Sequence, residues 1–348
     1  MNQRYQLPPE WAPQSAVMLT WPRSDGDWNP DYASVERCHT QLATEISKRE
    51  QVIITCMDET HAEKIRRMVK DAGGRPERLH LFALPSNDAW ARDHGPMTVL
   101  KDGRLTLLDF IFNGWGEKYP HAEDNKITER LHARGAFGKT SMESFRLVLE
   151  GGSIEVDGEG TLLTTESCLL NPNRNPSLSR TQIEAELHRL LGVDRILWLK
   201  HGAIDGDDTD GHIDTLARFC GAGTIAYQTC DDASDPHYSG LRAMAEELRA
   251  LRRKDGQAYK LVPLPWPAAI HDHTGRRLPA TYANFLIVNG AVLVPTYNDR
   301  ADALALAALK PVFPDREMVA VLCRALIYQY GSLHCVTMQL PEGVIPGS

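Results

Sequence analysis

A run of acidic residues surrounds one histidine near the middle of the sequence. Residues 205–214 read Asp-Gly-Asp-Asp-Thr-Asp-Gly-His-Ile-Asp, so His212 has aspartates on both sides. Such a run predicts a cation site, and an acid beside an imidazole raises its pKa and favours the imidazolium form. An EF-hand calcium loop is excluded, because placing Gly211 at its sixth position puts Ala217 at the twelfth, where an acid is required. If residues 212–214 are extended, His212 and Asp214 point to the same face; a solvated acidic loop is the alternative.

Two further segments place a carboxylate beside glycines. Asp93 lies three residues after Trp90 and just before a Gly-Pro turn. Since aspartate is common in turns, a capping or pairing role is the alternative to a functional one. Glu150 precedes Gly151 and Gly152, which would allow the backbone to approach closely beside the carboxylate. An ordinary bulge or loop is the alternative there.

A cysteine near the C-terminus, Cys335, follows a short Gly-Ser loop and is expected to begin a strand. A thiol at a strand end can be held by the backbone and still reach a reactant, although an inert buried cysteine is the common case. Its neighbour His334 is not expected to be its partner, because adjacent strand residues face opposite ways.

Length, charge and cysteine content narrow the class of protein. The chain has 348 residues, 42% of them hydrophobic, and a net charge of −8. These values are typical of a globular protein and disfavour a nucleic-acid partner. No apolar run is long enough to cross a membrane and the first residues do not form a signal peptide, so we expect a cytoplasmic protein. The seven cysteines include no CxxC pair, which argues against a zinc ribbon or a disulfide framework.

Hairpin signals recur along the chain and predict the elements that must position these residues. Turns at 102–103, 157–158 and 289–290 are Asp-Gly or Asn-Gly flanked by strand-like runs, and a weaker turn lies at 221–223. Apolar stripes predict helices over 35–46, 180–191 and 241–251, with Ser179 and Gln182 as a capping box and Gly192 as the stop. Short strands are expected at 52–55, 79–82, 196–199 and 261–264.

The spacing of the four turns indicates an internal repeat of hairpin, helix and strand. A chain of this length holds about five such units, and no linker-like stretch separates two halves. We therefore expect an α/β fold built as one closed, repeat-based propeller, with residues 1–348 forming a single domain. An open α/β sheet with antiparallel additions is the alternative.

Six segments in order resemble the agmatine deiminase family, within the guanidine-modifying (pentein) superfamily. They are Trp90–Pro96, Phe112–Tyr119, Leu149–Ser153, Asp210–Asp214, Thr281–Phe285 and His334–Thr337. The resemblance covers nearly the whole chain and implies a five-bladed ββαβ propeller. It departs from the family pattern at Tyr330-Gly-Ser-Leu-His-Cys335, where many members have Gly-Gly-Asn-Ile-His-Cys, and partly at Trp21–Trp28. These departures leave the reaction type unchanged and put the exact substrate in question.

The resemblance also implies the roles of individual residues. Cys335 would be the nucleophile, His212 the general acid and base, and Asp93 and Asp214 the carboxylates that grip a guanidinium. Glu150 matches an acid that orients the histidine in related enzymes. Residues near the substrate would be Trp90, Asp208 and Asn284, and a distal ammonium could meet Trp90 or Trp115 and Asp88 or Asp208. The family implies no metal, no organic cofactor and a homodimer.

A guanidinium needs such residues because it is planar, cationic and a poor electrophile. Two carboxylates match its N–H groups, and a thiolate is a suitable soft nucleophile. The same carboxylates should keep Cys335 protonated until a cation binds, so we expect substrate-assisted activation. The expected reaction converts agmatine and water to N-carbamoylputrescine and ammonia through a thiouronium on Cys335.

Three alternatives use the same residues. A deiminase of free or peptidyl arginine and an amidinotransferase would need the same cysteine, histidine and acids, and a polyamine-binding module would bind without turnover. A metal-dependent hydrolase is disfavoured, because the segment 210–214 supplies only one imidazole.

Overall fold

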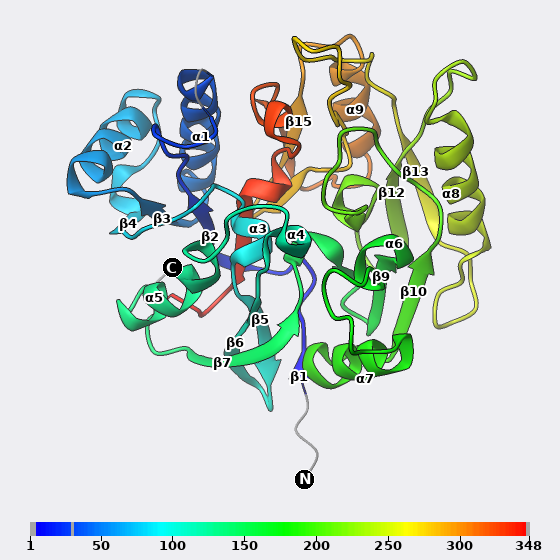
Figure 1. Cartoon of the computed structure of the whole chain (residues 1–348), viewed down its shortest axis with the longest axis horizontal. Helices are drawn as coiled ribbons and strands as arrows, with labels where there is room; N and C mark the ends of the chain where they lie inside the picture. Colours follow the sequence, from blue (N-terminus) through cyan, green and yellow to red (C-terminus); the bar gives the residue numbers. More distant parts are fainter. Residues whose placement is uncertain (1–4, 29–30, 346–348) are drawn as a thin grey trace.

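The computed structural model describes residues 5–28 and 31–345, and its strands form five separate sheets (Figure 1). The sheets are β1 (Tyr5–Gln6), β5 (Met97–Lys101), β6 (Arg104–Ile111) and β7 (Ser141–Val148); β10 (Arg195–Leu199), β9 (Thr161–Thr165) and β8 (Glu155–Val156); β11 (Ala217–Phe219), β12 (Thr224–Gln228) and β13 (Lys260–Leu264); β14 (Leu286–Val288), β15 (Ala291–Thr296) and β16 (Glu317–Leu322); and β17 (Thr337–Pro341), β2 (Gln14–Thr20), β3 (Gln51–Cys56) and β4 (Leu79–Ala83). Each sheet combines antiparallel and parallel pairs, so the α/β class is confirmed.

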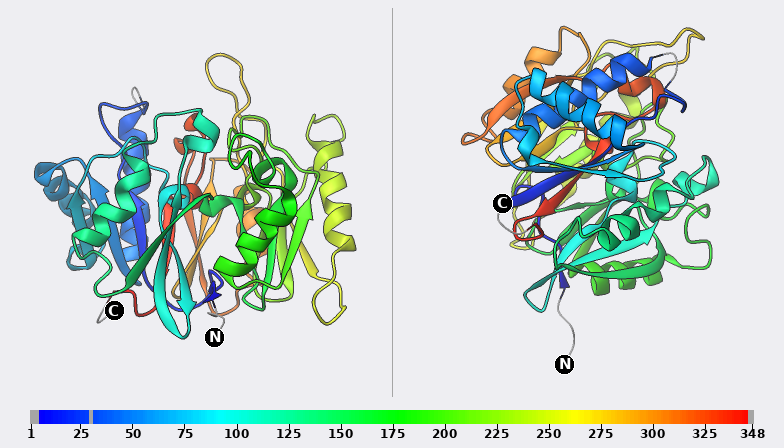
Figure 2. Two further views of the ribbon diagram at one scale, coloured as in Figure 1. Left: turned by 60° about the horizontal axis from the view of Figure 1, so that its bottom comes forward. Right: turned by 90° about the vertical axis from the view of Figure 1, so that its left-hand side faces the viewer.

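Helices connect the strands of these sheets. They are α1 (Tyr32–Ser47), α2 (Glu59–Asp71), α3 (Ala91–His94), α4 (Gly114–Glu117), α5 (Ile127–Ala133), α6 (Glu166–Leu169), α7 (Arg180–Leu191), α8 (Tyr238–Ala250) and α9 (Asp302–Leu309). Figure 2 shows the longer helices on the outside of the molecule, with strands between them. Within the described ranges, no helix is long and apolar enough to cross a membrane.

The predicted order of hairpin, helix and strand is confirmed. The pairs β5–β6, β8–β9, β11–β12 and β14–β15 are antiparallel, and a strand that follows a helix then joins each pair in parallel. The fifth sheet differs, because its antiparallel pair joins β2 near the N-terminus to β17 near the C-terminus. This sheet thereby joins a strand from the N-terminal part of the chain to the last strand.

Local sequence signals account for the best-predicted elements. Helix α7 begins at the capping box of Ser179 and Gln182 and ends at Gly192, whose left-handed φ of 68° suits a residue without Cβ. The turn before β15 likewise uses Gly290 at a φ of 71°. One hairpin strand is shorter than predicted: residues 153–156 were expected to be extended, but Ser153 belongs to a 3-10 turn and the strand is Glu155–Val156.

Two local expectations around the candidate site are wrong. Residues 212–214 are not extended, because Ile213–Thr215 form a 3-10 turn that begins after His212. Cys335 does not begin a strand either; it lies inside the 3-10 turn His334–Val336, and β17 starts at Thr337. Both segments sit at the junction of two elements, where the chain turns to bring its side chains inward.

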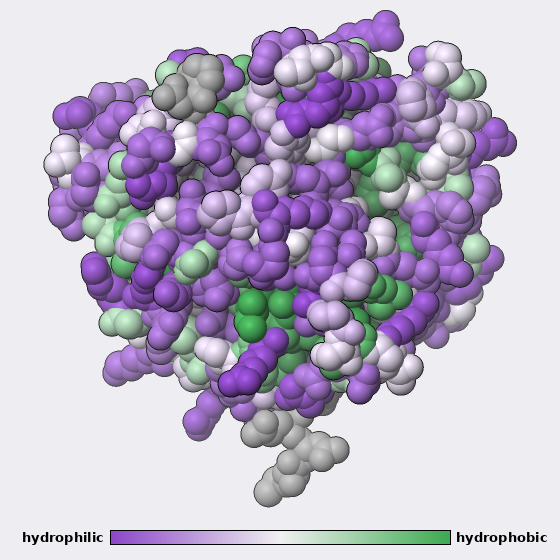
Figure 3. All heavy atoms as spheres, in the orientation of Figure 1, coloured by the Kyte–Doolittle hydropathy of each residue, from purple (hydrophilic) through white to green (hydrophobic). Residues whose placement is uncertain are grey.

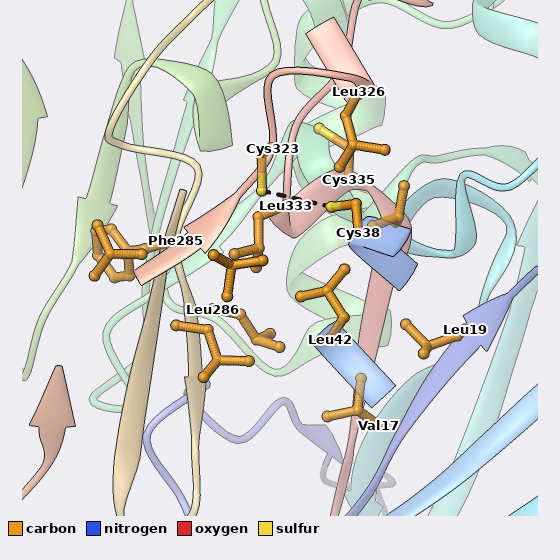
Figure 4. Close-up of a cluster of buried hydrophobic side chains, with 14 of the residues drawn as sticks. Val17, Leu19, Cys38, Leu42, Phe285, Leu286, Cys323, Leu326, Leu333 and Cys335 are labelled. Carbon is orange, nitrogen blue, oxygen red and sulfur yellow. Dashed lines mark hydrogen bonds between the residues drawn. The ribbon is translucent and has the colours of Figure 1, made fainter. Parts of the chain in front are cut away.

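The largest hydrophobic cluster packs α1, β2, β3 and the strands β14 and β15 together, and part of it is shown in Figure 4. All seven cysteines are buried and unpaired; Cys38 and Cys323 approach to 3.9 Å between sulfurs. Cys335 is also a member of this cluster and is labelled in Figure 4. By contrast, hydrophilic residues cover most of the face seen in Figure 3.

Candidate active site

One short helix and three 3-10 turns meet near the centre of the molecule. They are α3 and the turns Gly151–Ser153, Ile213–Thr215 and His334–Val336. Helix α3 packs against the turns Gly151–Ser153 and His334–Val336. Figure 1 places α3 and α4 where the five sheets come together. Asp93, Glu150, Asp214 and Cys335 lie on or beside these turns, so segments far apart in the sequence form one site.

Gly152 lies where three of the predicted site residues converge. A Cβ at this position would be 2.5 Å from His212 Nδ1, 3.0 Å from Asp93 Oδ1 and 3.1 Å from Asp214 Oδ2. Real Cβ atoms do not approach so closely, so only glycine fits here. The close backbone approach predicted for the two glycines after Glu150 is confirmed at Gly152.

Asp93 is held by two hydrogen bonds and faces the histidine. Its Oδ2 accepts from the Trp115 indole at 2.9 Å, its Oδ1 accepts from the Gly152 amide at 3.0 Å, and Oδ1 lies 3.7 Å from His212 Nδ1. Burial raises the pKa of Asp93 to about 6, and Asp214 adds to this effect while His212 opposes it. Near neutral pH, Asp93 is therefore mostly an ionised acceptor in a position fixed by its donors.

His212 is fully buried beside acidic groups. Neither ring nitrogen has a hydrogen-bond partner among the described residues, although Asp93 Oδ1 lies 3.7 Å from Nδ1. His212 does not line the pocket described below, so it lies behind the wall that faces a ligand. Burial lowers the pKa of His212, but Asp93, then Cys168 and Glu150, outweigh burial and raise it well above the ordinary value. The ring is therefore predisposed to be an imidazolium with a proton to donate.

Cys335 is 5% exposed, and its sulfur faces an amide and a carboxylate. The distance from Sγ to Asn284 Oδ1 is 3.4 Å and to Asp214 Oδ2 is 3.9 Å. Burial, with the charges of Asp214 and Asp93, raises the pKa of Cys335 well above the ordinary value. Without a bound cation, the group is a neutral thiol.

Asn284 positions the backbone of the cysteine turn. Its Oδ1 accepts from the amides of His334 and Cys335 at 2.8 and 3.3 Å, and its Nδ2 donates to the Asp214 carbonyl at 3.3 Å. Asn284 does not line the pocket described below. The structure therefore places it behind the thiol rather than in the wall that faces a ligand.

A network of buried charges beneath the thiol was not predicted. His334 has Asp214 Oδ2 at 2.7 Å from Nδ1 and Glu10 Oε2 at 2.7 Å from Nε2. A neutral imidazole donates from one nitrogen only, so the ring donates to both carboxylates only in its imidazolium form. Burial, with the charges of Arg218 and Arg92, nevertheless lowers the pKa of His334. Glu10 in turn accepts from Arg218 at 2.8 Å. No side-chain hydrogen bond joins His334 to Cys335 among the described residues, because Asp214 and Glu10 occupy the two ring nitrogens.

Glu150 makes its hydrogen bonds to an arginine rather than to the histidine. Arg174 Nε lies 2.9 and 3.0 Å from the two Glu150 oxygens, and both side chains are fully buried. Glu150 still lies near His212, because ligand atoms of Glu150, Cys168 and His212 are all within 4.8 Å of one another. That trio, and a second one formed by Glu10, Glu155 and His334, have donor sets that could hold a metal, but an arginine already neutralises the carboxylates of each.

A pocket with about 410 Å³ of empty space opens onto Cys335 and Asp93. It brings together most of the predicted substrate-binding residues with several that were not predicted. The lining consists of Asp27, Asp88, Trp90, Asp93, Trp115, Tyr119, Asp208, Thr209, Gln329, Tyr330, Gly331 and Cys335. Among the described residues, this lining includes four aspartates and no lysine, arginine or histidine, so the wall attracts cations.

Two of these aspartates are held by aromatic donors. Asp88 accepts from the indoles of Trp28 and Trp90 at 2.8 and 2.9 Å, and Asp208 accepts from the Tyr119 hydroxyl at 2.7 Å. Burial raises the pKa of each aspartate to about 6. Aromatic faces and acids in one pocket are typical of sites that bind an ammonium group.

Comparisons with known proteins agree with this geometry. The model of the Porphyromonas-type peptidyl-arginine deiminase family matches residues 6–341. The agmatine deiminase of Stutzerimonas stutzeri (strain A1501) is 36% identical over 97% of this chain and 95% of its own, and that of Pseudomonas putida is 36% identical over 98% and 96%.

Solved structures agree as well. A Porphyromonas gingivalis protein assigned provisionally as an arginine deiminase is 53% identical, covers 98% of this chain and 99% of its own, and has a TM-score of 0.90. A cysteine-to-serine variant of the C. jejuni agmatine deiminase, solved with substrate bound, is 36% identical over 98% and 97%, also with a TM-score of 0.90. A Microseira wollei amidinotransferase at 12% identity and a TM-score of 0.53 shares the fold alone.

The fold and the matches together define a hydrolase of carbon–nitrogen bonds in the guanidine-modifying class. The chain belongs to the Porphyromonas-type peptidyl-arginine deiminase family, and the expected kinship with agmatine deiminases is confirmed.

Proposed function

We propose that the protein hydrolyses agmatine to N-carbamoylputrescine and ammonia. The observation that carries this proposal is the composition of the pocket: a buried thiol, Asp93 and three further aspartates line it, and no described lysine, arginine or histidine does. Agmatine carries a guanidinium and a distal ammonium, so both of its charges would meet carboxylates. The names of the full-length relatives support the same substrate.

In the proposed mechanism, Asp93 and Asp214 bind the guanidinium and Cys335 attacks its central carbon. Bound substrate offsets the negative field at the sulfur, so the thiol releases its proton to solvent and becomes a thiolate. His212, as imidazolium, gives its proton to the departing nitrogen, and ammonia leaves a thiouronium on Cys335. Neutral His212 then takes a proton from water, which adds to the same carbon and displaces the sulfur.

Asp214 enters this mechanism with one oxygen free. Its Oδ2 is bonded to His334, whereas Oδ1 is buried with no hydrogen-bond partner among the described residues. An unpartnered buried carboxylate oxygen is costly, so its position favours a donor from the substrate. His334 lowers the pKa of Asp214 despite burial, which keeps the acceptor ionised.

Free arginine is the second candidate, because the 53% identical P. gingivalis protein is assigned provisionally to that activity. Arginine differs from agmatine by an α-carboxylate on the carbon that carries the amino group. This carboxylate would lie against the wall formed by Asp88 and Asp208, where the described residues offer it no lysine, arginine or histidine. Charge repulsion therefore favours agmatine over arginine.

We further propose that the five sheets are the blades of a closed ββαβ propeller that forms a single domain. The pairing of β2 with β17 supports closure, because it joins the first units of the chain to the last. The family resemblance implies a homodimer. This stays a prediction, which light scattering of the purified protein would test.

An ammonia-release assay with agmatine, arginine and an arginyl peptide tests the function. We expect turnover of agmatine, much slower turnover of the other two, and no turnover by Cys335→Ala. The matched control is Cys230→Ala, which removes a buried cysteine outside the pocket and should keep activity. Faster turnover of arginine would favour the second candidate, and binding of agmatine without turnover by the wild type would indicate a polyamine-binding module.

A further inference from the structure

Tyr330 separates the candidate active-site pocket from a second, larger cavity. That cavity has about 1810 Å³ of empty space, and its lining includes Arg37, Asp272 and Arg276. Asp27, Gln329 and Tyr330 belong to the linings of both spaces. Within the part of the chain that the structure describes, these three residues form the partition between the two spaces, and Tyr330 is the aromatic one among them.

The backbone at Tyr330 has a conformation that tyrosine rarely adopts. Its φ is 70° and its ψ is 0°, in the left-handed region, where it ends the short 3-10 turn Leu326–Gln329. A residue with a Cβ is strained in this region, because its Cβ crowds the neighbouring carbonyl oxygen. Such strained residues gather at ligand clamps and active sites, where a particular side chain is needed in spite of the cost. The next residue, Gly331, lies so close to Trp90 that a Cβ would be 2.1 Å from the indole.

The ring of Tyr330 is held from the side of the larger cavity. The Arg276 guanidinium lies over this ring, 4.3 Å from its centroid, and donates to its hydroxyl. Asp272 fixes the arginine through an ion pair of 3.0 Å. Both residues come from the loop of residues 271–277, which is gold and projects at the top of the left view in Figure 2. Arg276 lines the larger cavity but not the pocket.

We propose that Tyr330, held in place by Arg276, is the end wall of the substrate pocket and limits the length of the guanidino substrate. This inference rests on the proposed function and adds the property that selects among guanidines. A guanidine whose chain ends within the pocket meets the ring, whereas a longer chain would have to pass through it into the larger cavity. The positive charge of Arg276 behind the ring also disfavours passage of an ammonium group.

The test compares two substrates in variants of this wall. The substrates are agmatine and an ω-aminoalkylguanidine with a chain twice as long, so that both carry the same two charges. Tyr330→Gly removes the ring and suits the left-handed backbone, which protects the fold. Tyr330→Phe keeps the ring and loses the hydroxyl, and Arg276→Ala loosens the ring without altering a residue that lines the pocket. Thermal unfolding of each variant checks that it is folded.

We expect Tyr330→Gly to raise the ratio of kcat/KM for the long guanidine to that for agmatine by at least about tenfold, the scale on which pocket walls discriminate chain length. Arg276→Ala should give a smaller rise and Tyr330→Phe the smallest. If a folded Tyr330→Gly variant still turns over agmatine and this ratio is unchanged, Tyr330 does not limit substrate length. The proposed function would remain intact.

A binding measurement separates the two proposals. Calorimetry with both guanidines in the Cys335→Ala background, with and without Tyr330→Gly, measures length selectivity independently of turnover. One outcome is that the wild type hydrolyses neither guanidine while Tyr330→Gly shifts the relative affinity toward the long guanidine. In that case the proposed function is wrong, and the proposal that Tyr330 limits substrate length is supported. If neither guanidine binds to any variant, both proposals are overturned.

Discussion

Binding of a flat cation should convert the thiol of Cys335 to a thiolate. Its sulfur lies 3.9 Å from Asp214 Oδ2, and burial with the charges of Asp214 and Asp93 raises the pKa of the thiol well above its ordinary value. A guanidinium bound between these carboxylates would cancel most of their effect on the sulfur. The predicted change is therefore a fall in the pKa of Cys335 on binding.

The size of this fall follows from the distance. Two unit charges about 4 Å apart interact by about 4 kcal/mol at an effective dielectric constant of about 20. Each pKa unit corresponds to about 1.4 kcal/mol, so offsetting one such carboxylate lowers the pKa of Cys335 by about three units. The carboxylate of Asp93 adds to the effect in the same direction.

Ultraviolet absorbance of the thiolate, titrated against pH with and without guanidinium ion, measures this shift. Stopped-flow mixing reads the absorbance before any turnover, and the same titration of Cys335→Ser subtracts the other six cysteines. A shift of less than about one unit would refute substrate-assisted activation, because the electrostatic effect expected at this distance is several times larger.

Three other substitutions test the site. Gly152→Ala should lower kcat/KM by about 100-fold or more with the fold intact, since its Cβ would lie 2.5 Å from His212 Nδ1, whereas Gly240→Ala, with open space around it, should keep full activity. Glu150→Gln removes one of the two carboxylates on the buried Arg174, which keeps its ion pair of 2.7 Å with Asp210, and should lower the free energy of unfolding by about 1–3 kcal/mol in urea titrations. Asp93→Asn removes the acid that most raises the pKa of His212, so NMR titration should show the imidazolium losing its proton at lower pH; an unchanged midpoint would contradict this assignment.

The repeat could be predicted from the sequence because its signals are local. Asn-Gly and Asp-Gly turns and the capping box at Ser179 each depend on residues within a few positions, and the structure confirms the elements around them. Local signals did not predict the backbone at 212–214 and 334–336. An extended segment was considered at 212–214 and a strand was expected to begin at Cys335, but neither is observed. There the chain forms 3-10 turns at the junctions of elements, where tertiary packing decides the backbone.

Contacts between distant segments were the part that sequence reasoning missed. Nothing near Glu150 indicates that Arg174 pairs with it, and nothing near His334 indicates that Glu10 lies against its ring. The two-glycine signal after Glu150 did predict a close approach, but not that His212 and two aspartates would share the space. The departure from the family pattern at Tyr330 is a sequence signal for this region, because Tyr330 lines both the pocket and the larger cavity.

The proposed mechanism gives the carboxylates of Asp93 and Asp214 two roles that depend on each other. As hydrogen-bond acceptors they position the guanidinium, and as charges they keep Cys335 a thiol while the site is empty. A neutral thiol is a weak nucleophile toward other electrophiles and is less readily oxidised than a thiolate. A bound cation removes this protection only where the reacting carbon is already in place. Binding and activation are therefore coupled through one charge, which explains why an acidic pocket can serve a cysteine nucleophile that an acidic field would otherwise suppress.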